Sequence, residues 1–240
     1  MTALPAKLGA GRTVRELPGG IVSALAPENE GAPYDRKAAA YDRLIPSRIY
    51  SRLLWATDPD DYRAFAREAA ATAVDSGGPL LEVAGGTAVF TAKPYRSAPV
   101  EAVLSDLSVG MLERARERIA AADGPGRIHL LQADANDLPF EDGQFAVVAA
   151  MGALHVFEDL PALLQSLWRQ VARGGSLFLS GFVAETRVGS RYMRFLERAG
   201  ELAPPQTQAE LTETVGSALS SEPHVERKGS MAYVTVRTAS

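Results

Sequence analysis

Between residues 79 and 182, short apolar runs alternate with stretches of helical periodicity. The apolar runs are almost continuous, which is typical of strands covered on both faces in a parallel sheet. Two of the stretches between them predict amphipathic helices that begin after Ser108 and Asp159, residue types that cap a helix N-terminus. This alternation predicts an α/β fold with a mainly parallel sheet. The predicted strands are Leu80–Val83, Val100–Ser105, Ile128–Gln132, Phe145–Met151 and Ser176–Phe182.

The C-terminal tail departs from this alternation. A helical pattern at Gln208–Leu219 is followed by two strand-like runs, at His224–Gly229 and Met231–Arg237. Gly229 and Ser230 join the two runs as turn residues, so the tail predicts an antiparallel hairpin. We expect this hairpin to close one end of the sheet.

The first 78 residues have a different character. Residues 1–31 are rich in Ala, Gly and Pro and have no sustained period, which predicts a flexible arm. Tyr34–Tyr50 suits an amphipathic helix broken at Pro46, and Asp60–Val74 predicts a second helix. The expected organisation is the arm at 1–31, cap helices at 32–78, and a core at 79–240 that carries a substrate lid around 184–207.

Composition narrows the class of protein. The 240 residues are 46% hydrophobic and 22% charged, as in ordinary soluble proteins. The net charge of −4 argues against a nucleic-acid binder, which should carry a basic excess. No apolar run approaches the roughly 18 residues of a membrane span, and the first 20 residues lack the apolar stretch of a secretory signal. We therefore expect a cytoplasmic monomer or homodimer with no nucleic-acid or membrane partner.

The absence of cysteine excludes disulfides, thiolate metal sites and cysteine nucleophiles. No metal site is predicted.

The most informative segment begins at the first predicted strand, with Leu80-Leu81-Glu82-Val83 followed by Ala84-Gly85-Gly86-Thr87-Ala88. A strand that ends in an acid and turns through small residues brings bare backbone close to a ligand. The dinucleotide fingerprint G-x-G-x-x-G matches only at Gly86 when it starts at Ala84, and it is no better one residue later.

These residues resemble the first motif of the class I S-adenosylmethionine-dependent methyltransferases, in the small-molecule branch of types 11 and 25. Glu82 stands for the acid of that motif and Gly86 for its central glycine, while Ala84 and Ala88 replace the outer glycines. The resemblance implies a Rossmann-like, doubly wound sheet, mainly parallel with the antiparallel C-terminal hairpin, plus N-terminal cap helices.

Later segments resemble the family in the expected order. By resemblance, Asp106 after the second strand would bind the ribose hydroxyl groups. Asp134 after the third strand would bind the adenine amino group, and the Ala135 N–H would reach a ring nitrogen. The full set of residues that the resemblance assigns to S-adenosyl-L-methionine is Tyr41, Glu82, Ala84, Gly85, Gly86, Asp106, Leu107, Met111, Asp134, Ala135 and Met151.

His155 follows the fourth strand, close to where the methyl donor would lie, and is a candidate general base; a structural histidine is the competing interpretation. Four aromatic residues are candidates for the acceptor pocket, although aromatic side chains also pack cores. They are Tyr34, Tyr50, Trp55 and Tyr192.

The expected activity is methyl transfer to an oxygen, nitrogen or carbon atom of a small molecule, with secondary metabolites among the candidates. Two alternatives stay open. One is a non-methylating member of the fold that binds the cofactor structurally and catalyses a rearrangement or cyclisation. The other is an NAD(P)-dependent oxidoreductase, which Val89 and the terminal hairpin disfavour.

Overall fold

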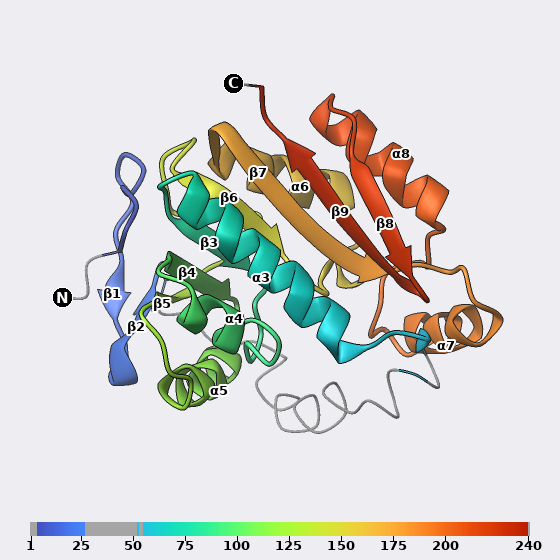
Figure 1. The fold of residues 1–240 in the computed structure, drawn as a ribbon, viewed down its shortest axis with the longest axis horizontal. Helices are drawn as coiled ribbons and strands as arrows, with labels where there is room; N and C mark the ends of the chain where they lie inside the picture. Colours follow the sequence, from blue (N-terminus) through green and yellow to red (C-terminus); the bar gives the residue numbers. More distant parts are fainter. Residues whose placement is uncertain (1–3, 27–51, 53–54, 240) are drawn as a thin grey trace.

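The computed structural model describes residues 4–26, 52 and 55–239, and every structural statement below refers to these residues. They form one nine-stranded sheet in the order β1-β2-β5-β4-β3-β6-β7-β9-β8 (Figure 1). The strands are β1 (Arg15–Glu16), β2 (Ile21–Ser23), β3 (Leu80–Val83), β4 (Glu101–Asp106), β5 (Arg127–Gln132), β6 (Phe145–Ala150), β7 (Val171–Phe182), β8 (His224–Lys228) and β9 (Met231–Arg237).

The strand order reverses beside β3. From β3 the chain moves outward through β4 and β5, and it then returns to place β6 on the opposite side of β3. All neighbouring pairs from β2 to β7 are parallel, whereas β1, β9 and β8 pair antiparallel. In open α/β sheets a ligand binds beyond the carboxyl ends of the strands at such a reversal.

Several helices begin at a residue whose side chain accepts a hydrogen bond from a backbone N–H group of the first helical turn. Ser108 caps α5 and Asp159 caps α6, as predicted, and Thr207 forms a capping box with Glu210 at the start of α8. The helices are α3 (Pro59–Asp75), α4 (Ala92–Ser97), α5 (Val109–Ala120), α6 (Leu160–Gln170), α7 (Arg187–Arg198) and α8 (Gln208–Leu219), with short 3-10 turns η1 (Pro18–Gly20) and η5 (Leu154–Val156).

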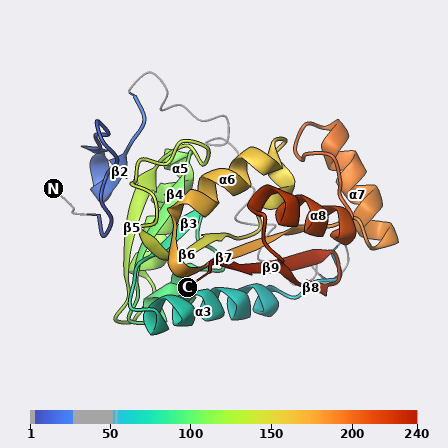
Figure 2. The ribbon, with the colours of Figure 1, turned by 90° about the horizontal axis from the view of Figure 1, so that it is seen from above.

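Helices cover both faces of the sheet (Figures 1 and 2). On one face, Phe65 of α3 and Tyr95 of α4 pack with Leu80 of β3, and Leu112 of α5 packs with Leu104 of β4. On the other face, α6 and α8 pack against the remaining apolar side chains of β3, β6 and β7. Because every residue of β3 and β6 is buried, these strands read as apolar runs in the sequence, interrupted only by Glu82 of β3.

The predicted α/β sheet with its antiparallel C-terminal hairpin is confirmed. One strand boundary differs by more than a residue, because β7 begins at Val171 and not at Ser176. Pairing passes from Phe145↔Val171 directly to Val147↔Ser176, so residues 172–175 form a bulge in which Gly174 has a φ of 71°. Gly174 and Gly175, which follow α6 in the sequence, lie in this bulge.

Residues 4–26 differ from the expected flexible arm. The β2 strand pairs in parallel with β5, and Ile21 is 0% exposed beneath Leu104 and Leu112. The expected helix at Tyr34–Tyr50 lies outside the described residues.

Replacing Ile21 by Ala tests whether β2 belongs to the folded core. We expect the free energy of unfolding to fall by about 2–5 kcal/mol, because a fully buried side chain leaves a cavity. Chemical denaturation measures the change, and Thr13→Ala, at an exposed position of the same segment, should stay within about 0.5 kcal/mol of the parent. Equal stability of both variants would mean that the segment is an arm after all.

Candidate active site

The parallel strands bring five loops to one edge of the sheet. The turn after β3 lies at its centre, between the loops that follow β4 and β6. Small residues are required in this turn. A Cβ on Gly85 would lie 2.7 Å from Cγ of Leu104, whereas a Cβ on Gly86 would meet nothing within 4 Å. The turn therefore packs tightly on β4 at Gly85 and leaves open space at Gly86.

Three residues of this turn have left-handed backbone conformations: Ala84 (φ 53°), Gly86 (φ 55°) and Ala88 (φ 53°). The two alanines that stand in place of the family's outer glycines therefore keep the backbone shape that glycine favours. An L-residue in this region costs about 1–2 kcal/mol, so the turn is strained at two positions.

Asp106 joins the ends of β3 and β4. Its Oδ2 accepts a hydrogen bond from Gly86 N (2.8 Å), and its Oδ1 accepts one from Ser108 N (2.9 Å). The side chain is only partly buried, and a carboxylate oxygen can accept more than one hydrogen bond. Asp106 can thus hold the glycine turn and still accept hydrogen bonds from a diol.

Glu82 lies beneath the turn and not in the open space. Its side chain is 1% exposed and faces Thr91 and Tyr95 at the start of α4. Burial raises the pKa of Glu82 to about 8, and the two hydroxyl groups oppose that rise. Neither hydroxyl closes a hydrogen bond of normal geometry, since Glu82 Oε2, Thr91 Oγ1 and Tyr95 OH all lack a partner. This geometry fits a residue that supports the turn from beneath better than a residue that contacts a ligand directly.

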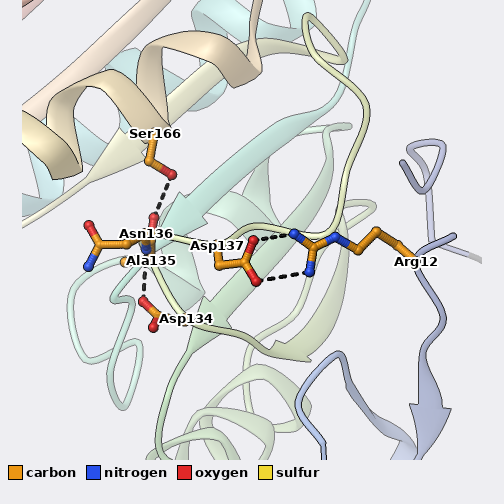
Figure 3. A network of polar contacts seen from close by, with 6 residues as sticks. All are labelled: Arg12, Asp134, Ala135, Asn136, Asp137 and Ser166. Atoms are coloured by element: carbon orange, nitrogen blue, oxygen red, sulfur yellow. Dashed lines mark hydrogen bonds and ion pairs between the residues drawn. The ribbon is translucent and has the colours of Figure 1, made fainter. Parts of the chain in front are cut away.

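The loop after β5 carries Asp134 and Ala135. Asp134 Oδ1 accepts a hydrogen bond from Asn136 N (2.8 Å), which forms a local turn, and Ala135 O accepts one from Ser166 Oγ of α6 (2.8 Å). Figure 3 shows the Asp134 contact within the loop, Ser166 of α6 reaching Ala135, and Arg12 reaching Asp137 from the N-terminal segment. That bidentate ion pair lowers the pKa of Asp137.

A buried amide that sequence reasoning missed joins these loops. Gln132, at the end of β5, is 0% exposed; its Oε1 accepts from Ser23 Oγ (2.9 Å) and its Nε2 donates to Leu107 O (3.0 Å). The N-terminal strand β2 is thereby tied to the loop that follows Asp106. The only signal for this role in the sequence is that a glutamine stands at the end of an apolar run.

His155 and two of the predicted acceptor residues meet in a row of aromatic rings. Phe182, the last residue of β7, stacks on Trp55 (ring centroids 3.8 Å apart) and lies 4.6 Å from the His155 ring. The ring of Tyr192 of α7 also contacts Trp55, with the ring centroids 5.2 Å apart. Sequence reasoning missed Phe182, which joins His155 to Trp55.

The hydrogen bonding of His155 does not favour a general base. Its Nδ1 accepts the Phe182 N–H (3.1 Å), so the proton of the neutral ring is assigned to Nε2. Burial lowers the pKa of His155 to about 4, which keeps the ring neutral. In this state Nδ1 already accepts a hydrogen bond from the Phe182 N–H, and Nε2 carries a proton and is a hydrogen-bond donor.

Tyr62 of α3 is a third residue that sequence reasoning missed. A Cβ on Gly152 would lie 2.3 Å from Tyr62 OH, and the Tyr62 ring stacks on Phe90 (4.7 Å). Tyr62 therefore spans from the segment after β3 to the loop after β6.

The remaining predicted residues fall into two groups. Met111 and Met151 are 6% and 8% exposed and pack in the core, whereas Leu107 is 38% exposed. Tyr34, Tyr41 and Tyr50 lie outside the described residues, so their predicted roles stay predictions.

Among the described residues, no group of acidic or histidine side chains could hold a metal ion, and no helix has the length and apolar character needed to cross a bilayer. A cavity of about 280 Å³ lies behind the loop after β5, between Arg12 and Arg169. None of the residues predicted to bind the cofactor lines it.

The comparisons with known proteins bear on this edge of the sheet. Residues 80–175 match the family model of a methyltransferase domain. This part of the chain is a class I, S-adenosylmethionine-dependent methyltransferase domain. The family and the cofactor expected from the motifs are thereby confirmed, and the oxidoreductase alternative falls away.

Two curated relatives have related names. The chain is 33% identical over 105 residues to the ubiquinone/menaquinone biosynthesis C-methyltransferase UbiE of Idiomarina loihiensis, covering 43% of this chain and 42% of the relative. It is 32% identical over 157 residues to the demethylmenaquinone methyltransferase of Clavibacter sepedonicus, covering 65% and 59%. The chain thus spans about half the length of the curated relatives that it matches.

Among solved structures, the trans-methyltransferase CalH in complex with S-adenosylhomocysteine has the same fold. It superposes with a TM-score of 0.58 at 20% identity, over 75% of this chain and 59% of that chain.

The residues of the candidate site fit the family's cofactor. The space beside Gly86 would leave bare backbone for a nucleoside, and the partly exposed Asp106 would offer a carboxylate to two ribose hydroxyl groups. When bound, S-adenosylmethionine supplies an electrophilic methyl group on a sulfonium.

Replacing Glu82 by Gln tests the protonation of the buried acid. In the fold the pKa of Glu82 is about 8, above its ordinary value of 4.5. The stabilising contribution of the neutral carboxyl group is therefore complete below about pH 4.5 and is lost as the pH rises through 8. Between these limits the group lowers the free energy of unfolding by about 1.4 kcal/mol per pH unit, and the Gln variant lacks this slope. In denaturation experiments at about pH 5, 6.5 and 8, the free energy of unfolding of the variant should rise relative to that of the parent as the pH increases.

Glu68→Gln, at an exposed position on α3, is the control, and its free energy of unfolding should change with pH as that of the parent does. Parallel curves for Glu82→Gln as well would mean that the carboxyl is charged in the fold.

Proposed function

We propose that the protein transfers the methyl group of S-adenosylmethionine to a carbon atom of a planar aromatic acceptor of the quinol class. The observation that carries the proposal is the row of aromatic rings at the ends of β6 and β7, on the same sheet edge as Gly86 and Asp106. A flat acceptor ring can stack against such side chains. The names of the curated relatives, which refer to quinone biosynthesis, support the same class.

The chain's own contribution is to bind and orient. Asp106 would hold the ribose, the turn at Gly86 would let the nucleoside approach the backbone, and Asp134 with Ala135 would contact the adenine. Trp55, Phe182 and Tyr192 would orient the acceptor ring and exclude water. Transfer then needs donor and acceptor held in line in a dry site, without a covalent enzyme intermediate.

Within this proposal Glu82 and His155 are positioning residues. Glu82 would support the glycine turn from beneath, and His155 would hold the end of β7 through the Phe182 N–H. A base that removes the acceptor's proton is not assigned to either side chain.

Thermal unfolding with S-adenosylmethionine, S-adenosylhomocysteine and NAD in parallel tests the cofactor part of the proposal. A ligand at about 100 times its Kd stabilises by about 2.7 kcal/mol, which corresponds to a rise in Tm of about 5–10 °C for a chain of this size. We expect this rise with the two sulfur nucleotides and none with NAD. Asp106→Ala should weaken S-adenosylhomocysteine binding by about 1–3 kcal/mol in calorimetric titration, because hydrogen bonds to a carboxylate are lost.

Asp123→Ala, in an exposed turn, is the matched control and should bind as the parent does. Unchanged affinity of Asp106→Ala would remove the ribose assignment. Cofactor binding without formation of S-adenosylhomocysteine from any naphthoquinol or benzoquinol acceptor would favour the non-methylating alternative.

Two substitutions at position 155 separate positioning from base catalysis. His155→Asn keeps an acceptor for the Phe182 N–H, whereas His155→Phe keeps a ring and removes that acceptor. We expect kcat with a short-chain prenyl naphthoquinol to fall less than about tenfold for Asn and further for Phe. A general base would instead cost about 10²–10⁴ in both variants.

A further inference from the structure

The α7 helix carries a stripe of positive charge that neither the fold nor the proposed site uses. At about 100° per residue, its four arginines fall within one arc of about 60°. All four are exposed, and none makes an ion pair in the part of the chain that the structure describes. They are Arg187, Arg191, Arg194 and Arg198. With Glu197 as its one acid, the helix has a charge of +3 (four minus one) in a chain whose net charge is −4.

Exposed apolar side chains lie beside this stripe. Phe195 is 62% exposed and Val188 is 54% exposed, and both fall on the flank of the arginine arc. Only Gly189 and Met193 of α7 are buried, on the side that faces the rest of the protein. In both ribbon views α7 lies at the outside of the molecule, beyond the end of the sheet (Figures 1 and 2).

We propose that α7 docks peripherally on an anionic lipid bilayer. A helix with an apolar flank and arginines beside it lies in the plane of a membrane interface, where its apolar side chains enter the boundary and its charges meet acidic headgroups. Charge complementarity selects an anionic surface. Phe195 and Val188 select a lipid over a nucleic acid, because a polyanion alone would leave both side chains in water.

The docking face is connected to the candidate acceptor site. Tyr192, on the same helix, contacts Trp55, and Trp55 stacks on Phe182 beside His155. A lipid-soluble acceptor leaving the bilayer at α7 would therefore meet the row of aromatic rings first. This connection rests on the proposed function, whereas the docking of α7 does not. The expectation of no membrane partner was drawn from the lack of a spanning segment, which a peripheral helix does not need.

Vesicle sedimentation of the full chain tests the docking. The probes are vesicles of phosphatidylcholine alone and vesicles that contain about one third phosphatidylglycerol. We expect binding to the anionic vesicles to be at least about tenfold stronger and to weaken at high salt. Arg191→Gln with Arg194→Gln should lower the partition coefficient by about thirtyfold, and Phe195→Ser by about tenfold.

The control is Arg67→Gln with Arg237→Gln, which removes the same charge from exposed positions on α3 and β9 and should bind as the parent does. The rise in Tm with S-adenosylhomocysteine is measured on every variant. An unchanged rise shows that the fold and cofactor site are intact, so loss of docking is distinguished from failure of the methyltransferase proposal.

Three results would overturn the docking proposal. They are absence of binding to anionic vesicles, binding that survives the α7 substitutions, and binding that depends on the arginines but not on Phe195 and is matched by heparin. The last result would identify a polyanionic partner in place of a lipid surface.

Discussion

The hydrogen bond from Gly86 N to Asp106 Oδ2, 2.8 Å long, is the contact on which the candidate site depends. It joins the turn after β3 to the end of β4, the two loops that a nucleoside must contact together. The turn can make this bond only because Gly85 packs against Leu104 without a side chain of its own. Parallel pairing of β3 with β4 and β6 then places the loops after β5, β6 and β7 along the same edge.

The N-terminal segment gives this edge its support. Hydrogen bonds run from Ser23 of β2 through the buried Gln132 to Leu107 O in the loop beside Asp106, and Arg12 holds Asp137 in the neighbouring loop. A buried amide that lost either partner would leave polar groups unpaired at a cost of about 1–3 kcal/mol each. The N-terminal segment thus contacts Gln132 and Asp137 from more than a hundred positions away in the chain, and Gln132 passes this support to the loop that would bind ribose.

Much of the fold could be predicted from the sequence because the period of apolar residues reports burial directly. The helix at Gln208–Leu219 and the hairpin after it have the expected bounds to within a residue, and the caps at Ser108 and Asp159 were visible as residue types. Strands β1 and β2 were not predictable, since two or three residues are too few to show a period and their pairing with β5 is long-range. In the site, motif spacing located Gly86 and Asp106. It could not show that Glu82 turns inward, that Phe182 joins the aromatic row, or that the Phe182 N–H occupies a nitrogen of His155, because each depends on side-chain direction.

The antiparallel strands at the two ends of the sheet also govern how the protein behaves among its own copies. An exposed strand edge is a template for pairing with another chain, which leads to aggregation. One edge here is β1, only two residues long and composed of Arg15 and Glu16. The other edge is β8, which carries Glu226, Arg227 and Lys228 in succession. Short length and charge oppose the addition of a further strand at both ends of the described sheet, so edge-to-edge pairing between copies of the chain is disfavoured.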